Sequence, residues 1–244
     1  MKRERTGYIT KVYEEFKQGD TLYRICDYKN DAGIMERHLS YKPIDNSFFY
    51  LHSSIYIDQN IITQPIYIIP QELVKMYFSG KDINRFLVLG CAGCTFPRFL
   101  LQFSPLSVGV GIENSETMIH IALKYFMEGC FWNRFSLVHA DAFLFMSKLA
   151  KQQEYDLIFV DLFTGTEIPE QINSDNFVSN LFSCSTDNSL IIVNLLGSSD
   201  QFINEFVTKA RLLFGTVHTF DKKEHKYTIL LHGNAEKESA FFGV

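Results

Sequence analysis

The stretch that decides the fold is residues 86–113, FLVLGCAGCTFPRFLLQFSPLSVGVGIE. It opens with an apolar run typical of a buried strand, continues with a turn of small residues at 90–95, and then shows a helical pattern over 96–103. Small residues let a cofactor approach the backbone, and the start of a helix favours negative charge. This order of strand, turn and helix predicts the first unit of a nucleotide-binding α/β sheet.

Acidic residues close the next three predicted strands. Glu113 follows an apolar run and lies about 20 residues after Gly90, where a carboxylate can bind the two hydroxyls of a ribose. Asp141 and Asp161 stand just past the ends of the next two apolar runs. Because the carboxyl ends of parallel strands share one edge of a sheet, we expect all four residues to meet in one crevice.

The composition of the 244 residues is that of a globular protein, and its net charge would suit a small cationic substrate. The net charge is −5 and 46% of the residues are hydrophobic, so the chain lacks the basic footprint of a nucleic-acid-binding protein. No apolar run is long enough to span a membrane, and the first residues lack the apolar core of a signal peptide. We therefore expect a cytoplasmic protein without nucleic-acid or membrane partners.

Cysteine and histidine usage argues against disulfides and metal. The five cysteines are an odd number without regular spacing, which favours reduced thiols. Cys91 and Cys94 form a C-x-x-C pair at the predicted turn, so a redox pair is one alternative there. Two cysteines are too few for a zinc site, and no histidine has ligand spacing beside them. We expect no metal.

Strand-like and helical runs divide the chain into three parts. We predict a small β domain at 1–58, a connecting segment at 59–84, and an α/β domain at 85–244. The β domain is indicated by short runs separated by turn formers, at 8–13, 22–26, 34–41 and 48–57. Helices are predicted at 71–78, 96–103, 115–126, 143–151, 175–184 and 200–214, and a closing antiparallel pair of strands at 217–220 and 227–231.

Four segments resemble spermidine synthase-like proteins, which share the fold of S-adenosylmethionine-dependent methyltransferases. They are LGCAGCTFPR (89–98), GIEN (111–114), ADA (140–142) and DLIFVDLFTG (156–165). The resemblance covers roughly 85–196 well and the flanks loosely. It implies an α/β, Rossmann-like S-adenosylmethionine-binding domain, with a mostly parallel sheet and a C-terminal antiparallel pair. It also implies a small N-terminal β domain and a homodimer.

The resemblance assigns the nucleoside-binding residues. Glu113 would bind the ribose, and Asp141 the adenine amino group with Ala142 beside the ring. The methionine-derived end of the co-substrate would lie against the turn, at Gly90, Ala92, Gly93 and Cys94. The residues themselves leave simpler alternatives open: Glu113 could be a solvated loop acid, and Asp141 a helix N-cap.

The resemblance also assigns catalysis and substrate contact. Asp161 would orient the attacking amine and accept its proton, a role commonly worth about 10²- to 10⁴-fold in rate. Alternatively, Asp161 could bond only the backbone amides near it. Further substrate contacts are implied near the connecting segment and after Asp161, with Tyr56, Gln59, Gln64 and Thr164 as candidates.

The turn and the substrate side depart from the family pattern. Gly93 and Thr164 stand where the family has acidic residues facing a diamine, and a hydrogen bond to a charged group is worth about 1.5–3 kcal/mol. Glu167 and Glu170 are candidates to compensate. Ala92 and Cys94 stand where the family has glycine, so each adds a Cβ close to the cofactor.

Three functions follow. The first is a spermidine synthase-like transferase that modifies a small amine, using decarboxylated S-adenosylmethionine or S-adenosylmethionine. The second is a methyltransferase with an unknown acceptor. The third is a non-catalytic relative that binds a nucleoside or a protein, which the substitutions in the turn motivate.

Overall fold

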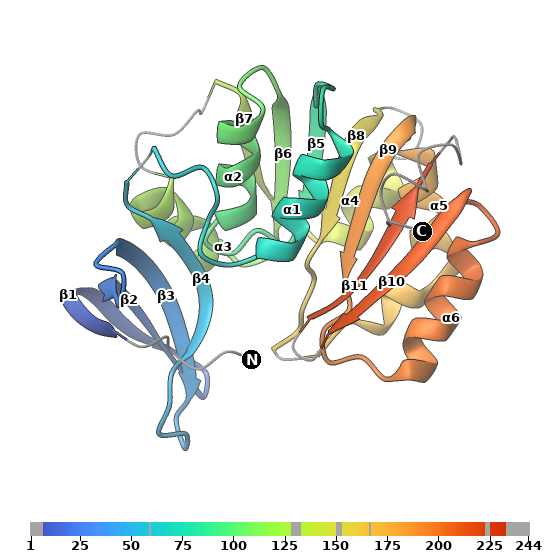
Figure 1. Ribbon diagram of the computed structural model, residues 1–244. Coiled ribbons are helices and arrows are strands. Elements are labelled where there is room, and N and C mark those ends of the chain that lie inside the picture. The colour runs from blue at the N-terminus through green and yellow to red at the C-terminus, as the bar shows by residue number, and fades with distance from the viewer. Residues whose placement is uncertain are drawn as a thin grey trace.

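We describe a computed structural model of the protein at residues 7–58, 60–127, 133–149, 153–165, 167–222 and 225–232. Two β-sheets organise this part of the chain, one of four strands and one of seven (Figure 1). The four-stranded sheet lies within the predicted β domain, and the seven-stranded sheet lies within the predicted α/β domain. The α/β fold class with an N-terminal β unit is thereby confirmed.

The larger sheet has the strand order β10-β11-β9-β8-β5-β6-β7. Its strands are β5 (Arg85–Leu89), β6 (Val108–Glu113), β7 (Phe135–His139), β8 (Tyr155–Val160), β9 (Ser185–Asn194), β10 (Thr216–Lys222) and β11 (His225–Leu231). Neighbours from β7 to β9 are parallel, whereas β11 is antiparallel to β9 and to β10. Since the chain builds outward in opposite directions from β5, a ligand crevice is expected beside the carboxyl end of β5.

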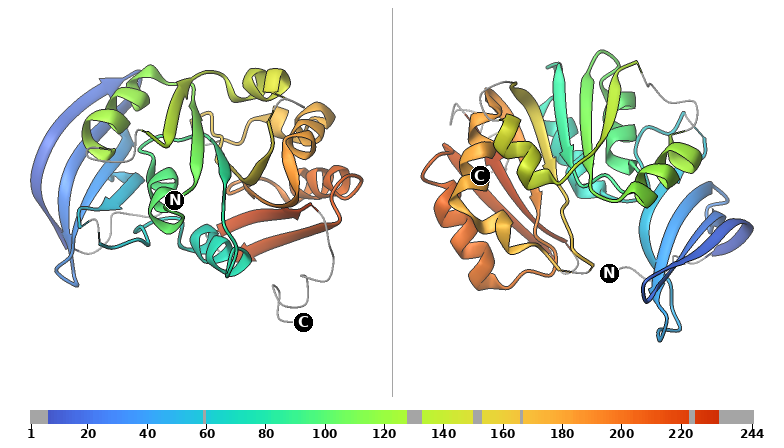
Figure 2. Two further views of the ribbon diagram at one scale, coloured as in Figure 1. Left: turned by 90° about the horizontal axis from the view of Figure 1, so that it is seen from above. Right: turned by 180° about the vertical axis from the view of Figure 1, so that it is seen from behind.

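Helices cover both faces of this sheet. Helices α1 (Ile68–Tyr77) and α2 (Thr95–Phe103) lie in front of it in Figure 1, and α4 (Ala142–Leu149) lies on the opposite face in the rear view of Figure 2. In β5, Phe86 and Val88 pack with α1 and α2, while Leu87 and Leu89 pack with α4, α5 (Asp175–Ser183) and α6 (Asp200–Ala210). Burial on both faces explains why the central strands are continuously apolar.

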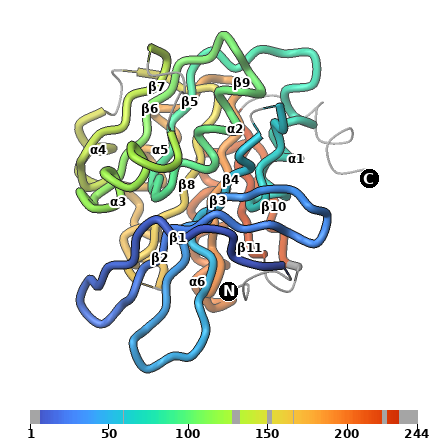
Figure 3. The backbone as a smooth tube through the Cα atoms, turned by 90° about the vertical axis from the view of Figure 1, so that its left-hand side faces the viewer, coloured from blue at the N-terminus to red at the C-terminus, as the bar shows by residue number. Residues whose placement is uncertain are grey.

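The smaller sheet is an antiparallel meander that packs beside α3. Its strands are β1 (Gly7–Gln18), β2 (Thr21–Asn30), β3 (Met35–Pro43) and β4 (Tyr50–Tyr56). Ile25, Leu39 and Ile55 from this sheet form one core with Met118 and Ile121 of α3 (Glu116–Ile121). Figure 3 views the molecule from the side of this sheet. The apolar face of the meander is thus buried against the α/β domain.

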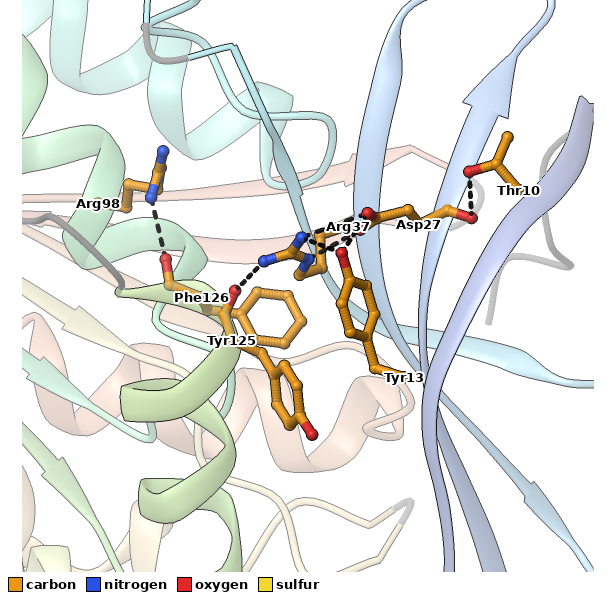
Figure 4. A network of polar contacts seen from close by, with 7 residues as sticks. All are labelled: Thr10, Tyr13, Asp27, Arg37, Arg98, Tyr125 and Phe126. Carbon is orange, nitrogen blue, oxygen red and sulfur yellow. Dashed lines mark hydrogen bonds and ion pairs between the residues drawn. The ribbon is translucent and has the colours of Figure 1, made fainter.

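Arg37 of β3 ties the two sheets together (Figure 4). Its guanidinium donates to the Asp27 carboxylate at 2.8 Å, to the Tyr13 hydroxyl at 2.8 Å, and to the backbone carbonyl of Tyr125 at 2.9 Å. Tyr13 in turn donates to Asp27 at 2.6 Å. The planar, five-donor guanidinium allows one side chain to serve all three acceptors. This cluster fixes β3 against the end of the helix that follows β6.

The predicted helix at 115–126 divides into two parts. Helix α3 ends at Ile121, and Ala122–Phe126 forms a π-helical turn in which the Met127 amide donates to the Ala122 carbonyl. Two arginine side chains satisfy carbonyl groups at the end of this wider turn: Arg37 donates to the Tyr125 carbonyl and Arg98 to the Phe126 carbonyl. The tertiary partners, which are distant in sequence, therefore decide this end of the helix.

The bounds of other helices also differ from those predicted from the sequence. Helix α1 begins at Ile68 rather than 71 and accommodates Pro70, because the first N–H groups of a helix have no partner within it. Helix α6 ends at Ala210 rather than 214, and α4 covers Ala142–Leu149. The remainder of the predicted helix at 143–151 lies outside the described residues.

Replacement of Arg37 by alanine is expected to lower the free energy of unfolding by about 3 kcal/mol, since it leaves the mostly buried Asp27 carboxylate without its ionic partner. Urea unfolding monitored by circular dichroism measures this. Arg24→Ala is the control in the same sheet, because Arg24 pairs with the exposed Glu15 and should cost about 1 kcal/mol or less. Equal losses in the two variants would show that the Arg37 cluster does not hold the sheets together.

Candidate functional site

The carboxyl ends of the central strands meet at one cavity. The Asp161 amide donates to the Leu89 carbonyl at 2.8 Å and the Gly90 amide donates to the Ile112 carbonyl at 2.9 Å, so the ends of β5, β6 and β8 are joined. The cavity has a volume of about 810 Å³ and extends from these strand ends to the N-terminal sheet. Its size is in the usual range for a small-molecule site. Of the sequence-predicted residues, it brings together Gly90, Ala92, Glu113, Asp141, Ala142, Asp161 and Thr164.

The turn after β5 adopts a left-handed backbone at three places. Gly90 has φ 84°, and a Cβ there would lie 2.2 Å from the Asp161 carbonyl oxygen, so no larger residue fits. Ala92 and Cys94 have φ 41° and 55°, a region that costs an L-residue roughly 1–2 kcal/mol each. Two residues that carry a Cβ thus hold a left-handed backbone that glycine would adopt without strain.

Glu113 offsets this strain. One carboxylate oxygen accepts from the amides of Cys91 at 3.1 Å and Ala92 at 2.9 Å, and the other accepts from the Ser115 amide at 3.0 Å. An ionised carboxylate has about four acceptor positions, so roughly one is left for a hydroxyl in the cavity. Glu113 therefore organises the turn in addition to facing the cavity, where a ribose was predicted.

Asp141 caps a helix at the cavity edge. One of its carboxylate oxygens accepts from the Leu144 amide at 2.8 Å, as an N-cap residue does. The side chain is exposed, and it lines the cavity together with Ala142 and Phe143. Both interpretations from the sequence are compatible with this geometry, because a capping carboxylate keeps acceptor positions for a second partner.

Asp161 lies between the strand ends and the N-terminal sheet. Its carboxylate accepts from the Tyr67 hydroxyl at 2.6 Å and from the Asn194 side-chain amide at 2.7 Å. Burial raises the pKa of Asp161, the two donors oppose that rise, and the negative charge of Glu113 adds to it. The result is a carboxylate with defined orientation and increased basicity.

Tyr67 and Asn194 were missed as site residues. Asn194 closes β9 just as Asp161 closes β8, so the rule of polar strand ends could have found it. Tyr67 gave no such signal: it has φ 60° before α1, and its ring packs edge-on against Phe96 and Phe159. Tyr227 of β11 also lines the cavity, and burial raises its pKa. Long-range packing places all three beside Asp161.

The cavity does not include Gln64. Its side-chain oxygen accepts from the Tyr56 amide at 3.1 Å and its amide nitrogen donates to Gln102 at 3.0 Å, and the residue is fully buried. We do not propose Gln64 or Tyr56 as substrate ligands. Gln59 lies outside the described residues. Thr164 does line the cavity, in an exposed turn where its amide and carbonyl pair with Glu167.

Gly93 and Cys94 are covered by β4. The Gly93 amide donates to the Ser53 hydroxyl at 3.1 Å, and a Cβ at position 93 would lie 2.6 Å from the Cβ of Ser53. Thr95 donates to the Ser54 carbonyl at 3.1 Å. The turn therefore docks on the N-terminal sheet at the position where the family pattern carries an acid.

The C-x-x-C pair has the environment of structural thiols. Cys91 and Cys94 are both buried, and burial together with the neighbouring Cys94 raises the pKa of the Cys91 thiol. A raised pKa disfavours the thiolate that redox chemistry needs. This geometry gives no support to the redox alternative.

Within the described ranges, no group of three or more histidine, cysteine, aspartate or glutamate side chains has an arrangement that could hold a metal ion. No helix in these ranges combines the length and apolar character that crossing a bilayer requires.

In sequence, the chain is similar to a polyamine aminopropyltransferase. No protein-family model matches it. It is 28% identical over 153 residues to the polyamine aminopropyltransferase of Vibrio vulnificus, an alignment that covers 60% of this chain and 50% of that protein. The chain thus spans about half the length of the curated relative that it matches.

Solved structures share the fold. A probable spermidine synthase from Corynebacterium glutamicum matches with a TM-score of 0.69 at 15% identity, covering 96% of this chain and 86% of that one. A spermidine synthase in complex with the transition-state analogue AdoDATO matches at 0.65 and 14% identity, covering 97% and 81%. Human methyltransferase-like protein 13 in complex with SAH matches at 0.60 and 18% identity, covering 70% and 82%. Together with the sequence match, these confirm the resemblance to spermidine synthase-like proteins.

Glu113→Ala is expected to lower the free energy of unfolding by about 2–3 kcal/mol, because three backbone amides lose a charged acceptor. Asp141→Ala, which removes a carboxylate at the neighbouring strand end, should cost about 1 kcal/mol as the loss of a helix cap. Chemical unfolding of both variants tests the difference. A smaller loss for Glu113→Ala than for Asp141→Ala would contradict the role of Glu113 in the turn.

Asp161→Asn is expected to be at least as stable as the parent protein at neutral pH. Burial raises the pKa of Asp161 in the folded state, so the free energy of unfolding falls as the pH rises from the ordinary aspartate range through the raised value. Asparagine removes this charge and still accepts from Asn194, while the Tyr67 hydroxyl can turn to accept. Unfolding midpoints across that pH range measure the effect. A clear loss of stability in the variant at neutral pH would show that the charge is favourable in the fold.

Proposed function

We propose that this protein is a spermidine synthase-like transferase that moves an aminopropyl group from decarboxylated S-adenosylmethionine to a small amine. The observation that carries the proposal is Asp161, a half-buried carboxylate of raised pKa that follows the end of β8 and lines the cavity beside Tyr67 and Asn194. Glu113 at the end of β6 and Asp141 after β7 line the same cavity. A nucleoside held by these two would place its reactive end near Asp161.

The charges of the cavity favour the decarboxylated donor. Glu113, Asp141 and Asp161 line it, and the described lining residues include neither lysine nor arginine. The carboxylate of intact S-adenosylmethionine would therefore meet acidic side chains without a cationic partner. The decarboxylated form lacks that group and carries positive charge at both its amine and its sulfonium, which complements the cavity.

The nucleoside end has an apolar wall. Four apolar residues that line the cavity are next to Glu113 or Asp141 in sequence or lie on α3 and α4: Ile112, Met118, Ala142 and Phe143. An adenine ring needs such apolar surfaces together with a few polar groups at its edge. We assign Asp141 to the adenine amino group, Ala142 to the ring face, and the remaining acceptor position of Glu113 to a ribose hydroxyl.

Asp161 would then act as the base. A sulfonium donor supplies a carbon that is open to nucleophilic attack. The acceptor ammonium first gives one proton to the Asp161 carboxylate, which exposes the nitrogen lone pair. That nitrogen forms a bond to the carbon beside sulfur, and the carbon–sulfur bond breaks with its electrons moving to sulfur, leaving a neutral thioether. Asp161 finally returns its proton to solvent.

Tyr67 and Asn194 would keep this base in position. Both donate to the Asp161 carboxylate, which fixes the direction of its remaining lone pairs. Burial raises the pKa of the Tyr67 phenol well above its usual range, and the charge of Asp161 adds to that effect, so the phenol keeps its proton. A proton-accepting group held in this way needs little reorganisation when the amine arrives.

A thermal-shift titration distinguishes the functions. Methylthioadenosine is the product of aminopropyl transfer, and it should stabilise the protein more than S-adenosylhomocysteine, which carries the disfavoured carboxylate. The reverse order would point to methyl transfer instead. A protein that responds to neither compound, nor to either form of S-adenosylmethionine, would be a non-catalytic relative.

Asp161→Asn should reduce aminopropyl transfer by about 10²- to 10⁴-fold, because the amine loses its proton acceptor. The measurement is the rate of methylthioadenosine formation. Asp156→Asn is a matched control at the opposite end of β8, where Asp156 accepts from the amides of Asn84 and Arg85 and does not line the cavity. Full turnover in Asp161→Asn would remove Asp161 from the mechanism.

A further inference from the structure

A row of aromatic rings crosses the N-terminal sheet. It takes one side chain from each strand: Phe16 of β1, Tyr23 of β2, Tyr41 of β3 and His52 of β4. Phe16 stacks on Tyr23 with ring centroids 5.1 Å apart and planes at 9°. Tyr23 and Tyr41 are 6.3 Å apart, and Tyr41 meets His52 edge-on at 5.7 Å. We call these four residues the aromatic row.

The aromatic row faces the cavity. Tyr23, Tyr41 and His52 are half-buried and line it. Tyr23 and Tyr41 are register partners, as are Ile25 and Leu39 one alternation further along the same strands. The rings therefore share the face that packs on α3, and they continue its apolar surface into the cavity. Side chains held across four strands form a rigid platform.

The rings of this platform are neutral at physiological pH. Burial raises the pKa of Tyr41 to about 12 and also raises that of Tyr23. Burial lowers the pKa of His52, although the nearby Glu113 carboxylate opposes this. Tyr23, Tyr41 and His52, the three members of the row that line the cavity, therefore present no formal charge to a ligand.

The strands and turns of the N-terminal sheet contribute no carboxylate to the described lining of the cavity. The N-terminal sheet and its turns contribute Gln18, Thr21, Tyr23, Tyr41, Pro43, Leu51 and His52 to the lining. At position 93, where an acid would face this end, the contact with Ser53 leaves no room for a side chain. The Glu113 carboxylate near His52 already accepts from three backbone amides, so a second ammonium on the acceptor would be partly desolvated here with little compensation, which is unfavourable.

We infer that the acceptor is an arylalkylamine, whose amine reaches Asp161 and whose aromatic ring packs on Tyr23, Tyr41 and His52. This rests on the proposed function, because it names the substrate class of the same site. An aromatic ring on the acceptor gains affinity from burial and, in addition, from stacked or edge-on contacts with the rings of the row. A plain alkyl chain gains affinity from burial alone. One carboxylate, Asp161, is then sufficient for the acceptor.

Calorimetric titration with three amines tests the inference on the whole protein saturated with methylthioadenosine, and again without it. Phenethylamine should bind about tenfold or more tightly than butylamine, which has the amine without the ring. Putrescine, which replaces the ring by a second ammonium, should bind no better than butylamine. Tighter binding of putrescine than of phenethylamine would overturn the inference.

Tyr23→Leu and Tyr41→Leu should each weaken phenethylamine binding about tenfold and leave butylamine binding within about twofold. Tyr8→Leu is the control, an exposed tyrosine of the same sheet that does not line the cavity. An unchanged thermal shift with methylthioadenosine verifies that each variant is folded. Unchanged phenethylamine binding in both cavity variants would also overturn the inference.

These outcomes separate the two proposals. Transfer of an aminopropyl group to putrescine in preference to phenethylamine would keep the proposed function and refute the arylalkylamine acceptor. If phenethylamine binding depended on the aromatic row but the protein transferred no aminopropyl group, the arylalkylamine ligand would stand and the proposed function would be refuted.

Discussion

The structure depends on the carboxylate of Glu113 at the turn after β5. Ala92 and Cys94 hold a left-handed backbone that glycine would adopt without strain, and the bonds from Cys91, Ala92 and Ser115 to Glu113 offset that strain. With the turn fixed, the ends of β5, β6 and β8 stay together. The cavity and the position of Asp161 follow from this arrangement.

The N-terminal sheet completes the site from the other side. The Ser53 hydroxyl accepts a hydrogen bond from the Gly93 amide, and the Arg37 guanidinium donates one to the Tyr125 carbonyl. These two bonds hold the meander against both the turn and the helix after β6. Its aromatic row is thereby brought to the cavity. The contact between Ser53 and Gly93 also gives a physical reason for the missing acid: a side chain at position 93 would occupy the space of β4.

In the proposed function, Asp161 sets stability against proton transfer. A half-buried carboxylate near Glu113 is unfavourable when ionised, yet desolvation raises its pKa and makes it a better proton acceptor. The donors Tyr67 and Asn194 reduce the cost without removing it. A proton acceptor at this position would account for the retention of an unfavourable charge.

The sequence by itself determined the α/β fold, the N-terminal meander, and the acidic strand ends at Glu113, Asp141 and Asp161, because the periodicity of a strand and the residue that follows it are local properties of the chain. It could not place Tyr67, the aromatic row or the docking of Gly93 on Ser53, and it assigned Gln64 to a substrate that this buried side chain does not reach. Those features join residues far apart in sequence. Only the packing of one sheet against the other decides which of their side chains meet.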